Sequence, residues 1–228
     1  MNRIRSKPHG RLNSSLWQRF LSWLRLRTSP NVVDRIWEAY EDGSERERLG
    51  AVAALAAERL SYEEFVMELS LLHLRDRPYS CHDYARNLSQ YLGRSIEISV
   101  LSNAEFARPQ QDIIGDDGSS FGRLVLIQDR DDLYIEVPCS LSPWLLQYTV
   151  FHELGHLAAG HPPRTADGVR LPPSGRQLAR RPPLVSGLPQ KALEDLYEAE
   201  ADLRAEYAII TGSLGPIAVQ TARLSQIS

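Results

Sequence analysis

The chain contains 228 residues, of which 43% are hydrophobic and 24% are charged, and its formal net charge is -3. These proportions suffice for one substantial core with appendages, while two cysteines exclude a disulfide framework and predict free thiols in a reducing compartment. No run approaches the roughly eighteen apolar residues of a membrane-spanning helix, and the N-terminus lacks the apolar region of a signal peptide, so we expect a cytoplasmic protein.

Residues 1–30 are predicted to form a basic amphipathic arm. Before the first acidic residue, Asp34, the chain carries the basic residues Arg3, Arg5, Lys7, Arg11, Arg19, Arg25 and Arg27. From Leu16 to Leu26, apolar and aromatic residues recur at near-helical spacing between arginines, a pattern that suits an anionic membrane surface, a partner protein or nucleic acid. We favour a helix docked on its own domain, because no sequence-specific nucleic-acid module accompanies the arm.

The next part of the chain combines helices with a strand. Helices are predicted over 31–40, 46–60, 65–73 and 80–92, and a strand is predicted over 95–101, where apolar and polar residues alternate. Ser61 and Glu64 form a capping-box pattern ahead of the third of these helices. The predicted fold class is α+β, with a small antiparallel or mixed sheet packed with helices.

A further helix is predicted between Ser142 and Gly160. Ser142 is an N-cap candidate and is followed by a proline at the first helical position, while Gly160 and Pro162 end the helix. This helix contains the run His152-Glu153-Leu154-Gly155-His156, which is an HExxH motif.

The HExxH spacing is typical of zinc hydrolases. Residues four apart share a helix face, so His152 and His156 can reach one metal ion, while Glu153 faces the water molecule beside it. Gly155 costs about 1 kcal/mol relative to alanine within a helix, which is tolerable where a neighbouring backbone or a substrate comes close. The alternative is a buried helix whose histidines serve only the core.

A third metal ligand is predicted on a later helix over 191–210, which we expect to end at Thr211-Gly212. Its acidic residues include Glu194, Glu198, Glu200 and Asp202. Hydrolytic zinc sites commonly use two histidines and a glutamate. Glu198 shares a face with Asp202, whereas Glu200 lies about 200° round the helix from Glu198. We therefore predict Glu198 as the ligand, with Glu200 as the alternative.

Asp202 lies one turn after Glu198. Its carboxylate is predicted to accept a hydrogen bond from the outer ring nitrogen of a ligand histidine, which would set the tautomer of that histidine and raise its basicity. The competing interpretation is that these acidic residues form the solvated face of an amphipathic helix.

The motifs and their order resemble the ImmA/IrrE family of HExxH metallopeptidases. The matching runs are Thr149 to His156, Gly160-His161, and Glu198 with Asp202 and Ala205 at the family's spacing, while Arg204 stands where the family usually has an aromatic residue. The resemblance implies a Zn²⁺ ion held by His152, His156 and Glu198, with Glu153 as the catalytic base. It also implies two short strands before the HExxH helix, which residues 123–128 and 132–137 fit around an Asp-Arg-Asp turn.

The family resemblance predicts a zinc-dependent metallo-endopeptidase that cleaves a cytoplasmic regulatory protein, often a transcriptional repressor. In that chemistry zinc activates a water molecule and polarises the scissile carbonyl, while Glu153 takes the proton of the water and passes it to the leaving amine. The alternative is a non-proteolytic regulatory protein that keeps a structural zinc site and contacts protein or DNA through its basic arm. Glu153 favours the enzyme, because a structural site needs only the ligands.

A Pro- and Arg-rich insertion separates the two motif-bearing helices and is predicted to be a mobile basic loop. The predicted divisions are the arm over 1–30, a helical extension over 31–60, a metallopeptidase-like core over 61–212 with the insertion over 162–190, and a tail over 213–228. A solvated linker is the favoured interpretation of the insertion, and a lid over the cleft is the alternative.

Overall fold

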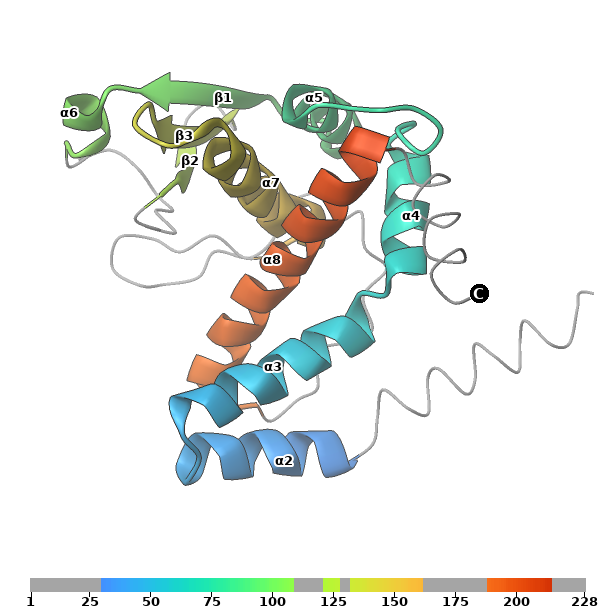
Figure 1. The fold of residues 1–228 in the computed structure, drawn as a ribbon, viewed down its shortest axis with the longest axis vertical. Helices are drawn as coiled ribbons and strands as arrows, with labels where there is room; N and C mark the ends of the chain where they lie inside the picture. The colour runs from blue at the N-terminus through green and yellow to red at the C-terminus, as the bar shows by residue number, and fades with distance from the viewer. Residues whose placement is uncertain (1–29, 109–120, 128–131, 162–187, 215–228) are drawn as a thin grey trace, which may run out of the picture.

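The computed structural model describes residues 30–108, 121–127, 132–161 and 188–214 (Figure 1). Most of three predicted segments lies outside the described residues: residues 1–29 of the N-terminal arm, residues 162–187 of the insertion, and the C-terminal tail beyond residue 214. Among the described helices, none is long and apolar enough to cross a membrane.

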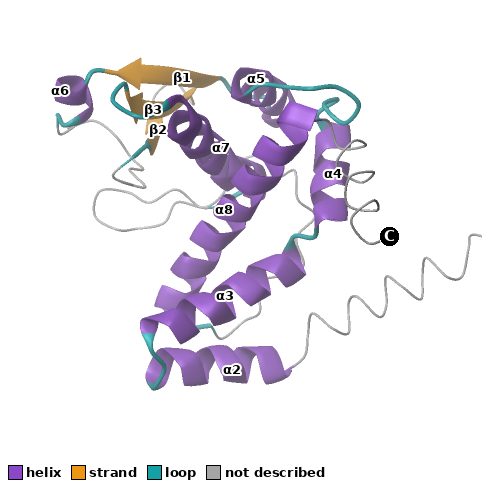
Figure 2. Ribbon diagram, in the orientation of Figure 1, coloured by secondary structure: helices purple, strands orange, loops and turns teal. Residues whose placement is uncertain are grey.

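The fold is mixed α+β, mostly helical with one small mixed sheet, which confirms the predicted fold class (Figure 2). In chain order the elements are α2 (Pro30–Glu41), α3 (Glu45–Arg59), α4 (Tyr62–Leu71), α5 (Cys81–Leu92), β1 (Ile96–Leu101), α6 (Asn103–Phe106), β2 (Arg123–Ile127), β3 (Asp132–Pro138), α7 (Pro143–Ala159) and α8 (Gln190–Leu214). The helices and strands predicted in these regions are present, with ends that differ by a few residues. Helix α8 crosses the molecule from α2 and α3 at one end to α4 and α5 at the other (Figure 1).

Local sequence signals explain where the helices begin. The side chain of Ser61 accepts a hydrogen bond from the backbone of Glu64, whose carboxylate accepts one from the backbone of Ser61, so the predicted capping box at α4 is confirmed. Ser142 caps α7 ahead of the proline at its first position, and Gly160 ends α7 with a φ of 63°. This left-handed conformation suits glycine, which has no Cβ to clash.

The three strands form a sheet in the order β1-β3-β2. β1 runs parallel to β3, with Ile98 opposite Ile135, and β2 runs antiparallel to β3, with Val125 opposite Tyr134. Alternate residues of β3, including Ile135, are buried on the face toward α7, as period-2 alternation requires. The two strands expected from the family resemblance are therefore present, although the turn between them lies outside the described residues.

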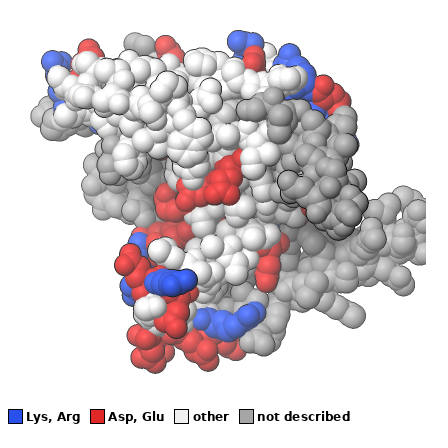
Figure 3. All heavy atoms as spheres, in the orientation of Figure 1, with Lys and Arg blue, Asp and Glu red and all other residues white. Residues whose placement is uncertain are grey.

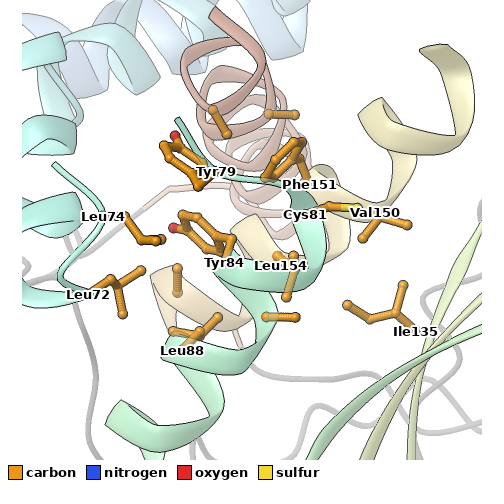
Figure 4. Packing of buried hydrophobic residues seen from close by; sticks show 14 of the residues in the cluster. Leu72, Leu74, Tyr79, Cys81, Tyr84, Leu88, Ile135, Val150, Phe151 and Leu154 are labelled. Carbon is orange, nitrogen blue, oxygen red and sulfur yellow. The ribbon is translucent and has the colours of Figure 1, made fainter. Parts of the chain in front are cut away.

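The main core fixes one side of α7. Val150, Phe151 and Leu154 of α7 are buried against the sheet and α5 (Figure 4). The Tyr84 and Phe151 rings meet edge to face, with centroids 5.9 Å apart, and Tyr79 meets Phe151 in the same way. Because these large side chains hold α7 by its apolar side, His152 and His156 are directed toward α8.

Helix α8 extends past its predicted end. We expected a stop at Thr211-Gly212, but the helix continues to Leu214 and that expectation was wrong. Gly212 serves a close contact instead, because a Cβ at Gly212 would lie 2.8 Å from the carbonyl oxygen of Tyr79. The backbone N–H of Tyr79 also donates to the carbonyl of Gly212 over 3.2 Å.

The helices predicted as an N-terminal extension pack on the first half of α8. The second cluster of buried residues comprises Ile36, Val52, Leu55, Ala56, Ala192 and Leu196, contributed by α2, α3 and α8. The hydroxyl of Tyr40 donates a 2.6 Å hydrogen bond to Asp195. One of the two helices that carry predicted ligands is therefore supported along its first turns by residues 31–60.

Candidate metal centre

Three predicted ligands lie together where α7 meets α8. The Nε2 atoms of His152 and His156 are 3.0 Å apart, and Oε2 of Glu198 lies 3.3 Å from the first and 3.7 Å from the second. The side chain of His156 is 3% exposed, whereas that of Glu198 is 50% exposed, so the cluster is closed on one side and open to solvent on the other. The ligand atoms of these three residues lie within 4.8 Å of one another, a spacing that can hold a metal ion.

The spacing of these atoms matches the ligand set of a tetrahedral zinc ion. With Zn–N and Zn–O distances of about 2.0–2.1 Å, neighbouring ligand atoms of a tetrahedron are separated by about 3.3 Å. The three observed separations, 3.0, 3.3 and 3.7 Å, bracket that value. Two imidazoles with one carboxylate also form one of the ligand sets that hydrolytic zinc sites use, with a fourth position left for water. The residues present therefore fit a zinc ion.

The outer nitrogen of His152 is bound to Asp202. Its Nδ1–H donates to Oδ1 of Asp202 over 2.8 Å, and the hydroxyl of Tyr148 donates to the same oxygen over 2.8 Å. These contacts leave Nε2 of His152 for the metal position. The predicted hydrogen bond between Asp202 and one of the two histidines is thus present, one helical turn after Glu198.

The outer nitrogen of His156 meets a third histidine. Nδ1 of His156 lies 2.9 Å from Nδ1 of His161, and Nε2 of His161 lies 3.2 Å from Oε2 of Glu200. Our sequence reasoning did not find this contact. The signal available was Gly160, whose left-handed conformation turns the chain at the end of α7 and brings the backbone N–H of His161 to the carbonyl of His156.

Glu200, the alternative ligand, does not belong to the cluster of His152, His156 and Glu198. It is buried and faces the other way from Glu198, where Arg59 of α3 donates to it and Arg204 lies 4.0 Å away. Arg204 in turn donates two hydrogen bonds to Glu68 of α4. The departure from the family pattern at Arg204 is thus part of a buried ionic network.

Glu153, the predicted base, is 1% exposed and follows His152 directly on α7. Its negative charge contributes to raising the pKa of His152. The carboxylates of Glu153, Glu198 and Asp202 thus all raise the pKa of His152.

The electrostatics of the metal-free cluster follow from this crowding. Burial disfavours a charge on His152, but its hydrogen bonds to Asp202 and Glu198 and the charge of Glu153 raise its pKa to about 10. Burial likewise opposes ionisation of Glu198, yet its contacts with the two histidines lower the pKa of its carboxyl. Acidic atoms gather over the middle of α8 on the face shown in Figure 3. The carboxylates around His152 thus favour a positive charge at this position.

Comparison of the chain with models of protein families, with curated proteins and with solved structures finds no match. The resemblance to the ImmA/IrrE family therefore rests on the motifs and their order alone.

Proposed function

We propose that this protein is a zinc-dependent metallo-endopeptidase. One observation carries the proposal: two imidazole nitrogens and one carboxylate oxygen lie at the separations of a tetrahedral zinc site, and the residue after the first histidine is Glu153. The half-exposed Glu198 favours an open, hydrolytic site over a structural one, because structural zinc sites are enclosed by four protein ligands.

His152, His156 and Glu198 would hold the ion. When bound, zinc supplies Lewis acidity, which lowers the pKa of water toward about 7 and polarises a carbonyl group. The Glu153 carboxylate accepts a proton from the attacking water and transfers it to the nitrogen of the leaving amine. Asp202 holds the proton of His152 at Nδ1, so that Nε2 keeps its lone pair.

The substrate class in this proposal comes from the family resemblance. It is a cytoplasmic regulatory protein, such as a transcriptional repressor, and the reaction is hydrolysis of a peptide bond in it. The competing function is a regulatory protein with a zinc site but no peptidase activity. The two functions differ in whether Glu153 is required.

Zinc content is the first test. Elemental analysis of purified wild-type protein should give about one zinc per chain, and Glu198→Ala should lose it. Asp195→Ala is the control on the same helix and should keep nearly stoichiometric zinc, since the Asp195 carboxylate accepts hydrogen bonds from Tyr40 and Lys191. A wild-type protein that binds no zinc after reconstitution would overturn the proposal.

Peptidase activity is the second test. Zinc-loaded protein is incubated with a peptide library prepared from a digested proteome, and new peptide ends are identified by mass spectrometry. Wild-type protein should produce them, while Glu153→Gln should keep its zinc and lose the cleavage by at least about 100-fold. Equal cleavage by both proteins, or none by zinc-loaded wild type, would rule out the proposed mechanism.

A further inference from the structure

The two ligand histidines are supported in different ways. His152 contacts a carboxylate directly, through Asp202 on the open side of the cluster. His156 contacts a second histidine, His161, which contacts the buried Glu200. His156, His161 and Glu200 are all buried, so water does not replace the contacts between them.

We infer that His161 and Glu200 are positioning residues that hold His156 in its metal-binding tautomer. The inference rests on the proposed zinc site and adds a function for two residues outside it. A neutral imidazole carries one proton, so His156 with Nε2 toward the metal carries its proton on Nδ1. Nδ1 of His161 then accepts the hydrogen bond that Nδ1–H of His156 donates. The proton of neutral His161 is therefore on Nε2, which donates to Glu200.

Glu200 is itself held in place. Arg59 donates to its Oε1, and Arg204 lies near its Oε2 while donating to both carboxylate oxygens of Glu68. Two carboxylates and two guanidinium groups thus lie together in the interior, where their charges balance. These contacts fix the Glu200 carboxylate with Oε2 beside Nε2 of His161, where it can accept a hydrogen bond.

This network brings distant parts of the chain to the metal centre. Arg59 comes from the last turn of α3, and Glu68 comes from α4. His156 lies in the last turn of α7, and His161 follows the C-cap of that helix, Gly160. The helices before the sheet therefore complete the support of a metal ligand. Supporting hydrogen bonds of this kind typically change metal affinity by about 10–100-fold.

A matched pair of substitutions at His161 tests the inference. The oxygen of an asparagine side chain falls near the Nδ1 position of histidine, so His161→Asn keeps an acceptor for His156, whereas His161→Leu has nearly the same shape and no acceptor. Zinc affinity is measured by competition with a chromophoric chelator. We expect His161→Leu to bind zinc about 10–100-fold more weakly than wild type, and His161→Asn to lose less than about 5-fold.

A merely structural role would affect thermal unfolding of the metal-free proteins but would leave the two variants with the same zinc affinity. Equal affinities in the two variants would overturn the inference while leaving the proposed function intact. Failure of wild-type protein to bind zinc would overturn the proposed function instead.

The wild-type protein offers a second measurement that does not depend on variants folding. Long-range ¹H–¹⁵N spectra of the zinc-loaded protein report which ring nitrogen carries the proton in each histidine. We expect a protonated Nδ1 in His156 and a protonated Nε2 in His161. A protonated Nδ1 in His161 would contradict the inferred direction of the hydrogen bonds.

Discussion

Gly155 of α7 lies directly against the backbone of Ala201 in α8. A Cβ at Gly155 would come within 3.1 Å of the carbonyl oxygen and 3.2 Å of the Cα of Ala201. Since Ala201 is flanked in sequence by Glu200 and Asp202, this approach sets the distance between the two helices at the level of His152, His156 and Glu198. The absence of a side chain at Gly155 is what allows histidine nitrogens on one helix to meet carboxylate oxygens on the other.

Gly155→Ala should therefore be destabilising, although alanine is the better helix former by about 1 kcal/mol. Overpacking against a backbone typically costs about 1–3 kcal/mol, so we expect the free energy of unfolding to fall by about 1 kcal/mol and zinc affinity to fall with it. Gly50→Ala is the control, since Gly50 is also helical but has open space around it, and it should gain up to about 1 kcal/mol. Urea unfolding measures the free energy of unfolding of both variants. An equal increase in the two variants would contradict the close contact at Gly155.

Asp202→Asn should weaken zinc binding by about 10-fold or more, because the amide is uncharged and holds the His152 tautomer less firmly. Asp195→Asn is the matched control on α8. Asp195 accepts hydrogen bonds from Tyr40 and Lys191, so its substitution should change stability and leave zinc affinity unchanged. Chelator competition distinguishes the two variants, and similar affinities in both would argue against a supporting role for Asp202.

Glu68→Ala should destabilise the fold by about 3–5 kcal/mol, since it leaves the buried guanidinium of Arg204 without its main partner. Glu68→Leu combined with Arg204→Met should cost less than Glu68→Ala alone, because the double variant removes both charges. Urea unfolding of the metal-free proteins measures the effect. A double variant as unstable as the sum of its single variants would show that the two residues act independently.

The metal-free protein should lose stability as pH rises toward about 10. The pKa of His152 is raised from 6.5 to about 10 in the folded state. Between these pH values, His152 therefore binds a proton in the folded protein that it does not bind in the unfolded protein. This contribution is fully present below pH 6.5 and disappears as pH rises through the folded-state pKa. With EDTA present, the difference in unfolding free energy between wild type and His152→Gln should shrink between pH 6.5 and about pH 9.5. A constant difference would contradict the raised pKa.

The sequence alone was sufficient to predict α7 and α8, the two helices that carry the cluster. Ser142, Pro143 and Gly160 are local signals, and they predicted both ends of α7 because capping depends on residues adjacent in the chain. Helical periodicity likewise placed Glu198 and Asp202 on one face of α8 and Glu200 on another. The structure brings Glu198 and Asp202 to the two histidines, and Glu200 lies away from the metal position.

Other features depended on contacts between residues far apart in the chain. Gly212 was taken as a helix stop because glycine is common there, but it lies inside α8, where the backbone of Tyr79 comes too close for a side chain. Helical periodicity predicted the direction in which Glu200 points around α8. Only the packing of α3 and α7 on α8 decided that Arg59 and His161 contact it. Caps and periodicity arise from interactions within a few residues, whereas the partner of a buried charge is set by which helices pack together, and the pattern of one helix does not contain that information.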